Sequence, residues 1–512
     1  MDVKLDDRAM GGCSYAHWMR PALSLMFAIL VLISGQWASA DAPIPSQENG
    51  NGLVIIDAQT FTPNLSGGLQ QSVAMSDADL IALKPAYASG VWADGTSVLV
   101  IRLEPFNLPT GAITFSIAPG PGAGVNQAVE STADRIGSLW EIMPQLPAPD
   151  AANFGSTSVT LPANGQPVVF YRPPNDFLLG GGQAKMLVKV TAALNGKIVA
   201  SGSFDLLPPT VIMVHGFGSS PSTWGGHQPG AFSGMVAAIN NDCPGIGIAR
   251  VDYSGEATSG IDEVAGNIPF WITKEVDAAR NAGVAATRPD LVVHSYGGIL
   301  SAWYAANMGL VVINRKDGFL PGLWNGAKDQ FIRAENYGRG DIRRLITIGT
   351  PFNGSPIAGA VETAMTAANI ESQLNFHGFA GDGEAVDDLM SNGSAISVIE
   401  QKQPAVAWLP IVCTAGQNPP ALQGAWGLLA GWAGRLLNMN PVLSDMVVFS
   451  TSQEDVAGTP ATSSVPVVGV IHTGETTDAG VELQVGTELD LKLPFNPPAG
   501  TVGHAASFNA KI

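Results

Sequence analysis

The hydrophobic period of the chain changes near residue 208, and this change predicts two different folds in series. Between residues 52 and 207, short alternating apolar runs are separated by Gly, Pro, Asn and Asp, as in "GVWADGTSVLVIRL" and "KMLVKVTAALNGKIVASG". Period-two alternation is typical of strands with one buried face, and the Asp-Gly and Asn-Gly pairs are hairpin signals. We therefore predict an all-β, sandwich-like domain over residues 41–207.

Beyond residue 208 the strands become fully apolar and alternate with longer helical stretches such as "FWITKEVDAARNAGVA". Apolar runs recur at "VIMVH", "IGIARVDY", "DLVVHS", "RRLITIGT", "LPIVCTAG", "DMVVFS" and "VPVVGVIH". Strands of a mostly parallel sheet are buried on both faces, so they need such continuous apolar runs. Residues 208–512 are therefore predicted to form an α/β domain whose sheet is covered by helices.

The N-terminal stretch has the pattern of an export signal. Arg20 precedes an apolar run from Ala22 to Ile33, and the small residues Ala38-Ser39-Ala40 follow it. This run is shorter than the roughly 20 residues that span a bilayer, so it predicts a cleaved signal peptide rather than an anchor. We expect residues 1–40 to be removed after Ala40 and the mature protein to be secreted or periplasmic. Either Met1 or Met19 could be the start.

Composition excludes one class of partner. The chain has 512 residues, 46% of them apolar, with 43 Asp and Glu against 25 Lys and Arg, a formal net charge of −18. Such a charge repels a phosphate backbone, so no nucleic-acid partner is expected.

Cys13 would leave with the signal, and Cys243 and Cys413 are expected to be free, mostly buried thiols. Because His and Cys show no metal-ligand spacing, we predict neither a metal centre nor a cofactor; a structural calcium ion and the oligomeric state stay open.

The stretch "VVHSYGG" ends an apolar strand with a serine and small residues. A nucleophilic serine needs such a turn, because its hydroxyl must stand beyond the strand where larger neighbours would clash. Ser295, flanked by His294 and Gly297, fits this nucleophile elbow, although Val293 stands where glycine is usual. Upstream, "HGFGSS" follows another apolar strand and offers backbone N–H groups for a developing oxyanion. We assign the backbone N–H groups of Phe217 and Tyr296 as donors, with His215 and Gly216 supporting that loop.

The blocks "VHG", "HSYGG" and "IGTPFNGSP" resemble the α/β-hydrolase superfamily, specifically secreted bacterial lipases and esterases, over about residues 208–472. The resemblance implies ester hydrolysis through an acyl-enzyme intermediate, with a Ser, Asp or Glu, and His triad in that chain order. The β region resembles bacterial immunoglobulin-like modules only loosely, because such modules share a pattern and no diagnostic residues.

The acid and the base of the implied triad follow the serine. "LSDMVVFSTSQ" resembles the family's acid segment, with Asp445 as the aspartate and Met446 where glycine is usual; Asp455 is the alternative. Among seven histidines, only His472 and His504 lie after the acid. His472 leaves the last apolar strand, where the family has its general base, and His504 is the alternative.

Three insertions are predicted to form caps, near residues 309–344, 353–406 and 417–443. The last is rich in Trp and Leu and reads either as a lid that meets lipid or as a core-packing helix, which we slightly favour. An apolar cap predicts an ester or lipid substrate, with transient contact with a lipid interface. Polyester depolymerase, thioesterase and acyltransferase activities use the same triad. The rival class is an inactive hydrolase-fold surface or adhesion protein.

Overall fold

The computed structural model describes residues 52–58, 87–104, 110–120, 132–141, 155–163, 167–177, 185–225, 234–256, 259–306, 336, 339–358, 384–391, 393–402, 406–415, 441, 444–445, 447–456, 459–460, 464–470 and 472–489. All of them belong to one compact unit, Pro45–Ile512. The predicted signal peptide, His504 and most of the three predicted caps lie outside the described residues, as does Met446.

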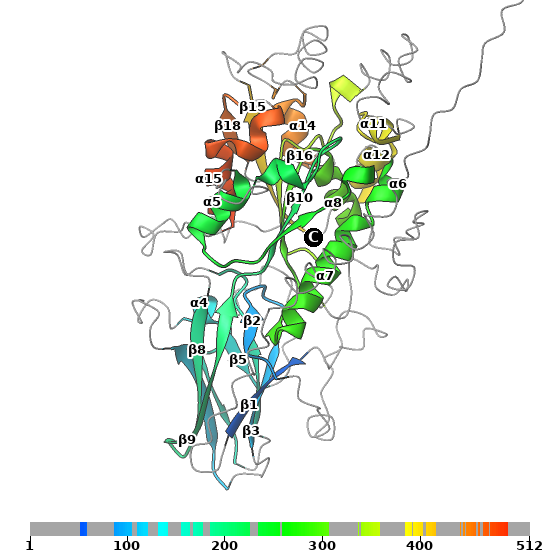
Figure 1. The fold of residues 1–512 in the computed structure, drawn as a ribbon. Coiled ribbons are helices and arrows are strands. Elements are labelled where there is room, and N and C mark those ends of the chain that lie inside the picture. Colours follow the sequence, from blue (N-terminus) through cyan, green and yellow to red (C-terminus); the bar gives the residue numbers. More distant parts are fainter. Residues whose placement is uncertain are drawn as a thin grey trace, which may run out of the picture. The chain divides into compact units, whose positions relative to one another are not determined.

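The first part of the chain forms two sheets (Figure 1). One has the order β1-β3-β7-β5, with β1 at Gly52–Asp57, β3 at Leu99–Glu104, β7 at Val168–Arg172 and β5 at Ser138–Trp140. The other has the order β12-β2-β9-β8-β4-β6, with β2 at Gly90–Trp92, β9 at Lys197–Leu207, β8 at Met186–Leu194, β4 at Ile113–Pro119 and β6 at Ser158–Leu161; its edge strand β12, at Val284–Ala285, comes from later in the chain. A short helix, α4 at Ala133–Ile136, precedes β5.

One apolar core joins these two sheets. Ile101 and Tyr171 of the first sheet share it with Phe115, Val190 and Phe204 of the second. The alternating burial of β4 and β8 shows why period-two runs form these strands, since every second side chain enters the core. The immunoglobulin-like assignment of this region and the boundary at residue 207 stay predictions; β9 ends at Leu207 and the next strand begins at Val211.

The two predicted turn signals have different outcomes. Asn195 and Gly196 have φ values of 50° and 80° and connect the antiparallel strands β8 and β9, as a hairpin requires. Asp94-Gly95, by contrast, makes no hairpin, because β2 and β3 belong to different sheets. The reason lies in the Asp94 side chain, which is buried and accepts hydrogen bonds from residues of the α/β part.

Asp94 and one short strand connect the β sheets to the α/β part. Strand β12, Val284–Ala285, pairs in parallel with β2 and becomes the edge of the six-stranded β sheet. Asp94 accepts hydrogen bonds from the backbone N–H groups of Thr287 and Arg288 at 3.1 and 3.2 Å and from the Thr287 hydroxyl at 2.7 Å. It also accepts the N–H groups of Thr96 and Ser97 at 2.8 Å each. The hydrogen bonds of Asp94 thus join the segment after β2 to the segment after β12, next to the pairing of these two strands.

We expect Asp94→Ala to lower the free energy of unfolding by about 3 kcal/mol or more, because it leaves several buried donors without an acceptor. The measurement is the urea unfolding midpoint of the purified protein. Asp205→Ala is the control, since Asp205 pairs with Lys185 at the surface and such pairs contribute about 0–1 kcal/mol. Equal losses in both variants would contradict this role of Asp94.

The α/β part contains a six-stranded, all-parallel sheet of order β11-β10-β13-β14-β15-β18. These strands are Ile248–Val251 (β11), Val211–Val214 (β10), Asp290–His294 (β13), Arg344–Ile348 (β14), Ala407–Thr414 (β15) and Val465–Val468 (β18). The chain runs from β10 outward to β11 and then returns to the other side of β10 at β13. The connection after β10 leads to β11 and the connection after β13 leads to β14, in opposite directions along the sheet. Open α/β sheets bind ligands at such a switch point.

Helices cover both faces of this sheet, as Figure 1 shows. On one face lie α6 (Ile261–Val264), α7 (Asn267–Asn281), α8 (Tyr296–Ala306), α11 (Glu384–Asp388) and α12 (Ser394–Lys402). On the other lie α5 (Met235–Asp242) and α15 (Ala479–Glu488). Successive strand residues alternate between the two cores: Leu291 and Val293 face α8, and Val292 faces α5 and α15. This explains why the strands are continuously apolar.

The described residues of "DMVVFS" do not form the predicted strand. Asp445, Val447 and Val448 lie in a turn closed by a bridge between Ser444 and Phe449, and α14, Ser450–Glu454, follows. The Asp445 carboxylate causes this difference, because it accepts the N–H groups of Val447 and Val448 at 2.8 and 2.7 Å and so competes with strand pairing. The strands β16 (Asp455–Val456) and β17 (Thr459–Pro460) form a small separate hairpin.

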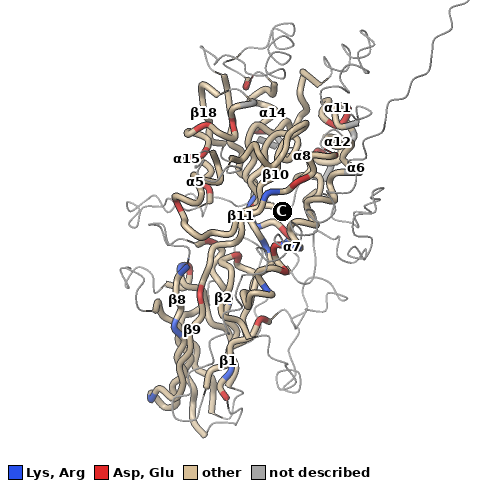
Figure 2. Tube along the Cα trace, in the orientation of Figure 1, with Lys and Arg blue, Asp and Glu red and all other residues tan. Residues whose placement is uncertain are grey.

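Figure 2 shows positively and negatively charged residues along both the β sheets and the α/β part. Cys243 and Cys413 are buried thiols outside any disulfide bond, as predicted. Among the helices of the described residues, none combines the length and the apolarity that a bilayer crossing requires.

Candidate active site

Ser295 lies on a strained turn at the end of β13. Its φ is 53°, and Asn195 is the only other described non-glycine residue with a positive φ. Strand β13 ends at His294 and helix α8 begins at Tyr296, so a single residue reverses the chain direction. A non-glycine residue in this conformation costs about 1–3 kcal/mol, which the surrounding structure must offset. The turn projects the Ser295 hydroxyl at the switch point of the sheet.

Glycines let the neighbouring segments approach this turn. A Cβ atom on Gly297 would lie 2.5 Å from the His215 carbonyl oxygen and 2.7 Å from that of Val214. One on Gly298 would lie 2.1 Å from the Thr350 hydroxyl, and one on Gly216 would lie 2.9 Å from the Ser295 Cβ. The elbow therefore packs directly against the loop after β10 and the loop after β14. Val293, the departure from the usual glycine, is fully buried in the sheet.

We expect Gly297→Ala to lower the free energy of unfolding by about 2 kcal/mol and catalytic activity by about 100-fold, because the new methyl group meets backbone atoms that cannot rotate away. Urea unfolding and ester hydrolysis measure the two effects. The control is Gly255→Ala, since a Cβ atom there has no heavy atom within 4 Å. A Gly297→Ala protein as stable and active as the Gly255→Ala protein would refute the tight elbow.

Ser295, His472 and Asp445 form a continuous chain of hydrogen bonds. The Nε2 atom of His472 lies 2.8 Å from the Ser295 Oγ, and its Nδ1 atom lies 2.9 Å from Asp445 Oδ2. His472 starts the 3-10 helix His472–Thr477 after β18, and its backbone N–H donates to the Asp445 carbonyl at 3.0 Å. All three residues are buried, none with more than 8% of its surface exposed. Of the alternatives, Asp455 belongs to β16 and His504 lies outside the described residues.

The carboxylate of Asp445 is held by a complete set of donors. Its Oδ1 accepts the two backbone N–H groups of the turn, and its Oδ2 accepts Gln453 Nε2 at 3.1 Å besides His472. Gln453 is itself fixed to strand β15, since its amide pairs with both the N–H and the carbonyl of Cys413 at 2.7 and 3.0 Å. Gln453 was not predicted, because a single glutamine eight residues after an aspartate carries no distinctive pattern.

The loop after β10 lies beside the elbow, with Phe217 and Tyr296 in edge contact at 6.4 Å between ring centroids. His215 is fully buried and stacks on Tyr253, whose hydroxyl donates to the His215 carbonyl. Burial lowers the pKa of His215 to about 4, although its hydrogen bond to the Gly216 carbonyl opposes the change. His215 is therefore a neutral residue that fixes the loop. The assignment of the Phe217 and Tyr296 N–H groups as oxyanion donors stays a prediction.

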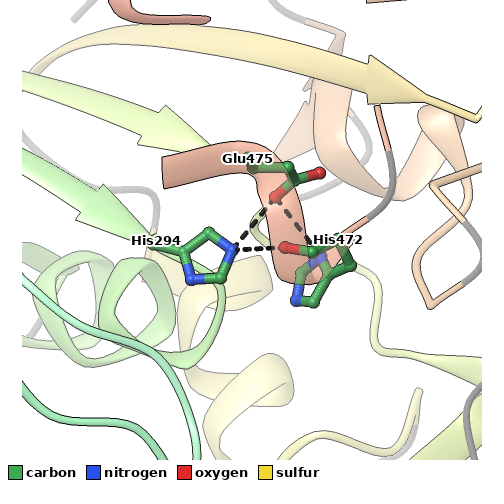
Figure 3. Close-up of side chains that lie close together, drawn as sticks. All are labelled: His294, His472 and Glu475. Carbon is green, nitrogen blue, oxygen red and sulfur yellow. Dashed lines mark hydrogen bonds and ion pairs between the residues drawn. The ribbon is translucent and has the colours of Figure 1, made fainter. Parts of the chain in front are cut away.

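A second buried carboxylate, Glu475, adjoins the base and was not predicted. Figure 3 shows it between His294 and His472; Glu475 Oε2 lies 3.0 Å from His294 Nε2 and 3.4 Å from His472 Nδ1. Burial lowers the pKa of His294, with Glu475 opposing that shift. Burial would also lower the pKa of His472, but Asp445 and Glu475 outweigh it and raise that pKa to about 10. A glutamate three residues after a histidine is too common to have indicated this site.

His294, His472 and Glu475 bring three possible metal ligands within 4.8 Å of one another. Both ring nitrogens of His472 already have hydrogen-bond partners, Ser295 and Asp445. A metal ion bound here would have to break one of these bonds. The arrangement fits proton transfer better than metal coordination.

Comparisons with known proteins give partial similarity. No family model matches the chain, and no curated protein matches it. Among solved structures, the chain is similar to the mature lipase BlEst2 of Bacillus licheniformis, with 18% identity, a TM-score of 0.36, and coverage of 56% of this chain and 92% of that one. It is also similar to EstA from Clostridium botulinum (14% identity, TM-score 0.36, 55% and 86% coverage) and lipase 1 from Pelosinus fermentans (13%, 0.36, 56% and 97%).

Proposed function

We propose that the chain is a serine hydrolase of α/β-hydrolase type that cleaves carboxylic esters through an acyl-enzyme intermediate. The observation that carries this proposal is the hydrogen-bonded chain from Ser295 through His472 to Asp445 at the switch point of the parallel sheet. A serine on a strained elbow, a base within 2.8 Å and a carboxylate on the far ring nitrogen are the parts that acyl transfer requires.

Each residue then has a defined step. Ser295 Oγ attacks the acyl carbon while His472 Nε2 takes its proton; the same proton passes to the leaving alkoxide, which departs as the alcohol. His472 then takes a proton from water, whose oxygen attacks the acyl-enzyme and releases the carboxylic acid and Ser295. Asp445 holds the imidazole through Nδ1 and stabilises its charged form. The N–H groups of Phe217 and Tyr296 would bind the oxyanion, aided by the positive N-terminal end of α8.

The substrate and the location of the enzyme belong to the same proposal. An ester or lipid substrate with transient lipid contact follows from the apolar segments predicted as caps. Secretion or export to the periplasm follows from the predicted signal peptide. Polyester depolymerisation, thioester hydrolysis and acyl transfer to an acceptor other than water use the same steps, so they are alternatives within this class.

Hydrolysis of p-nitrophenyl butyrate and p-nitrophenyl palmitate by the purified protein tests the proposal, with Ser295→Ala beside it. We expect release of p-nitrophenol by the parent protein and none above background by the variant; the ratio of the two rates separates esterase from lipase. A folded parent protein that hydrolyses neither these esters nor a polyester or thioester would favour the rival class, an inactive surface or adhesion protein.

A further inference from the structure

Glu475 is a second, fully buried carboxylate beside His472, although the imidazole of His472 already bonds to the carboxylate of Asp445. Its side chain is 0% exposed, and no N–H group of the described residues donates to its Oε1 atom. Gly349, at φ 55°, makes room for it, because a Cβ atom on that residue would lie 2.1 Å from Glu475 Oε2. Burying a carboxylate costs several kcal/mol unless a positive or donating group compensates. The fold therefore retains this carboxylate beside the base at a cost.

The donors around the two carboxylates are unequal. Asp445 accepts two backbone N–H groups and the Gln453 amide in addition to His472. Glu475 has His294 Nε2 at 3.0 Å and His472 Nδ1 at 3.4 Å, and the weak donor of the Cys413 thiol is its further partner. His294 Nε2 also lies 3.2 Å from the His472 carbonyl, so its N–H is shared between two acceptors. Glu475 therefore has the weaker set of donors, and a charged His472 ring faces both carboxylates.

Other titratable groups face the cluster from every adjoining element among the described residues. His294 comes from β13, Asp445 from the turn before α14, and Glu475 from the 3-10 helix of His472. Cys413 of β15, Asp478 before α15 and His215 after β10 also interact with the cluster. Burial raises the pKa of the Cys413 thiol and lowers that of His215 to about 4, so both are neutral near pH 7. The charge of His472 is therefore balanced mainly by Asp445 and Glu475.

We propose that Glu475 is a second positioning carboxylate of the base, which shares the imidazolium charge of His472 with Asp445 and couples it, through His294, to the strand that carries Ser295. This inference rests on the function proposed above. During attack the proton leaves Ser295 Oγ for His472 Nε2, and the positive ring then faces two carboxylates. Glu475 touches neither substrate nor the reacting atoms, so it acts only through the two histidines.

Two consequences distinguish this role from simple packing. Because Ser295 attack needs neutral His472, kcat/KM rises with pH through the pKa of His472, which the two carboxylates raise. Removing one carboxylate charge at this distance lowers that pKa by about one unit or more, so the midpoint of the pH profile moves to lower pH. In addition, Glu475 can still hold the ring after Asp445 is neutralised. The loss in Asp445→Asn is then smaller than the roughly 10⁴-fold typical of such a change.

The experiment compares Glu475→Gln, Asp445→Asn and the double variant with the parent protein. We expect Glu475→Gln to shift the midpoint of kcat/KM downward by about one pH unit, Asp445→Asn to lose about 10²- to 10³-fold in kcat, and the double variant to lose 10⁴-fold or more. Glu482→Gln, on the partly exposed face of α15, is the matched control and leaves the profile unchanged. An unshifted midpoint in Glu475→Gln, or a double variant no worse than Asp445→Asn, would overturn the proposal.

A second measurement separates this inference from the proposed function. The His472 ring is titrated by NMR in the parent protein and in Glu475→Gln, with His472→Ala to assign the signal. A lower His472 pKa in Glu475→Gln supports the inference even if no ester is hydrolysed, and an equal pKa refutes it even if the enzyme is active. Where Glu475→Gln does not fold, Glu475→Asp, which withdraws the charge by one methylene, is titrated instead, and a smaller downward shift is expected.

Discussion

Replacing Ser295 by alanine is expected to lower kcat for p-nitrophenyl ester hydrolysis by about 10⁶-fold. The Ser295 hydroxyl is the group on the strained elbow that the base can deprotonate, with Oγ 2.8 Å from His472 Nε2. Without it no acyl-enzyme can form, and the remaining groups can do no more than stabilise direct attack by water. Initial rates at saturating substrate, with circular dichroism to check folding, give the measurement.

A matched serine in the helix that follows the elbow controls for that change. Ser301 is fully buried in α8, and its hydroxyl donates to the Gly297 carbonyl at 2.8 Å. Ser301→Ala removes a hydroxyl from the same environment and is expected to leave kcat within a few-fold of the parent value. If Ser295→Ala kept more than about one per cent of the parent activity, Ser295 would not be the nucleophile.

Replacing His472 by alanine is expected to lower kcat by about 10⁵- to 10⁶-fold, because both proton transfers pass through its Nε2 atom. Among the described residues, the neighbouring His294 is no substitute, since its Nε2 is held by Glu475 and the His472 carbonyl. Rates are measured with both p-nitrophenyl esters at several pH values. The pH dependence seen in the parent protein is expected to disappear in the variant.

His504→Ala is the comparison that the sequence itself suggests, since His504 is the other histidine after the acid. This variant is expected to have unchanged rates and an unchanged pH profile. Were His504→Ala inactive and His472→Ala active, the hydrogen bonds of His472 would describe a structural cluster, and the assignment of the base would be wrong.

Much of the architecture was predictable because it depends on local pattern. Continuous apolar runs gave β10, β13, β14 and β15 at the predicted segments, since strands covered on both faces cannot alternate. The meeting of Ser295, His472 and Asp445 could be expected as well. Ser295 and His472 follow apolar strands, Asp445 lies in a segment that resembles the acid segment of the family, and loops at the carboxyl ends of neighbouring parallel strands converge at one edge of the sheet.

Other features depend on tertiary contacts that no local pattern encodes. Asp94-Gly95 has the composition of a hairpin, but the Asp94 carboxylate instead accepts donors from residues almost two hundred positions away. Likewise "DMVVFS" has the composition of a strand, and the Asp445 side chain folds it into a turn. Glu475 and Gln453 became visible only once the fold had brought them to the two histidines and to Asp445.

The central claim is that Ser295 forms a covalent acyl intermediate, and mass spectrometry after reaction with a phosphonate ester tests it most directly. The phosphorus is attacked by the activated hydroxyl, the leaving group departs, and a stable phosphonyl-serine remains. We predict one phosphonyl group per chain, on the peptide that contains Ser295, with no adduct in Ser295→Ala and a strongly slowed reaction in His472→Ala. A folded protein that takes up no phosphonyl group, or takes it up on another residue, would contradict the account.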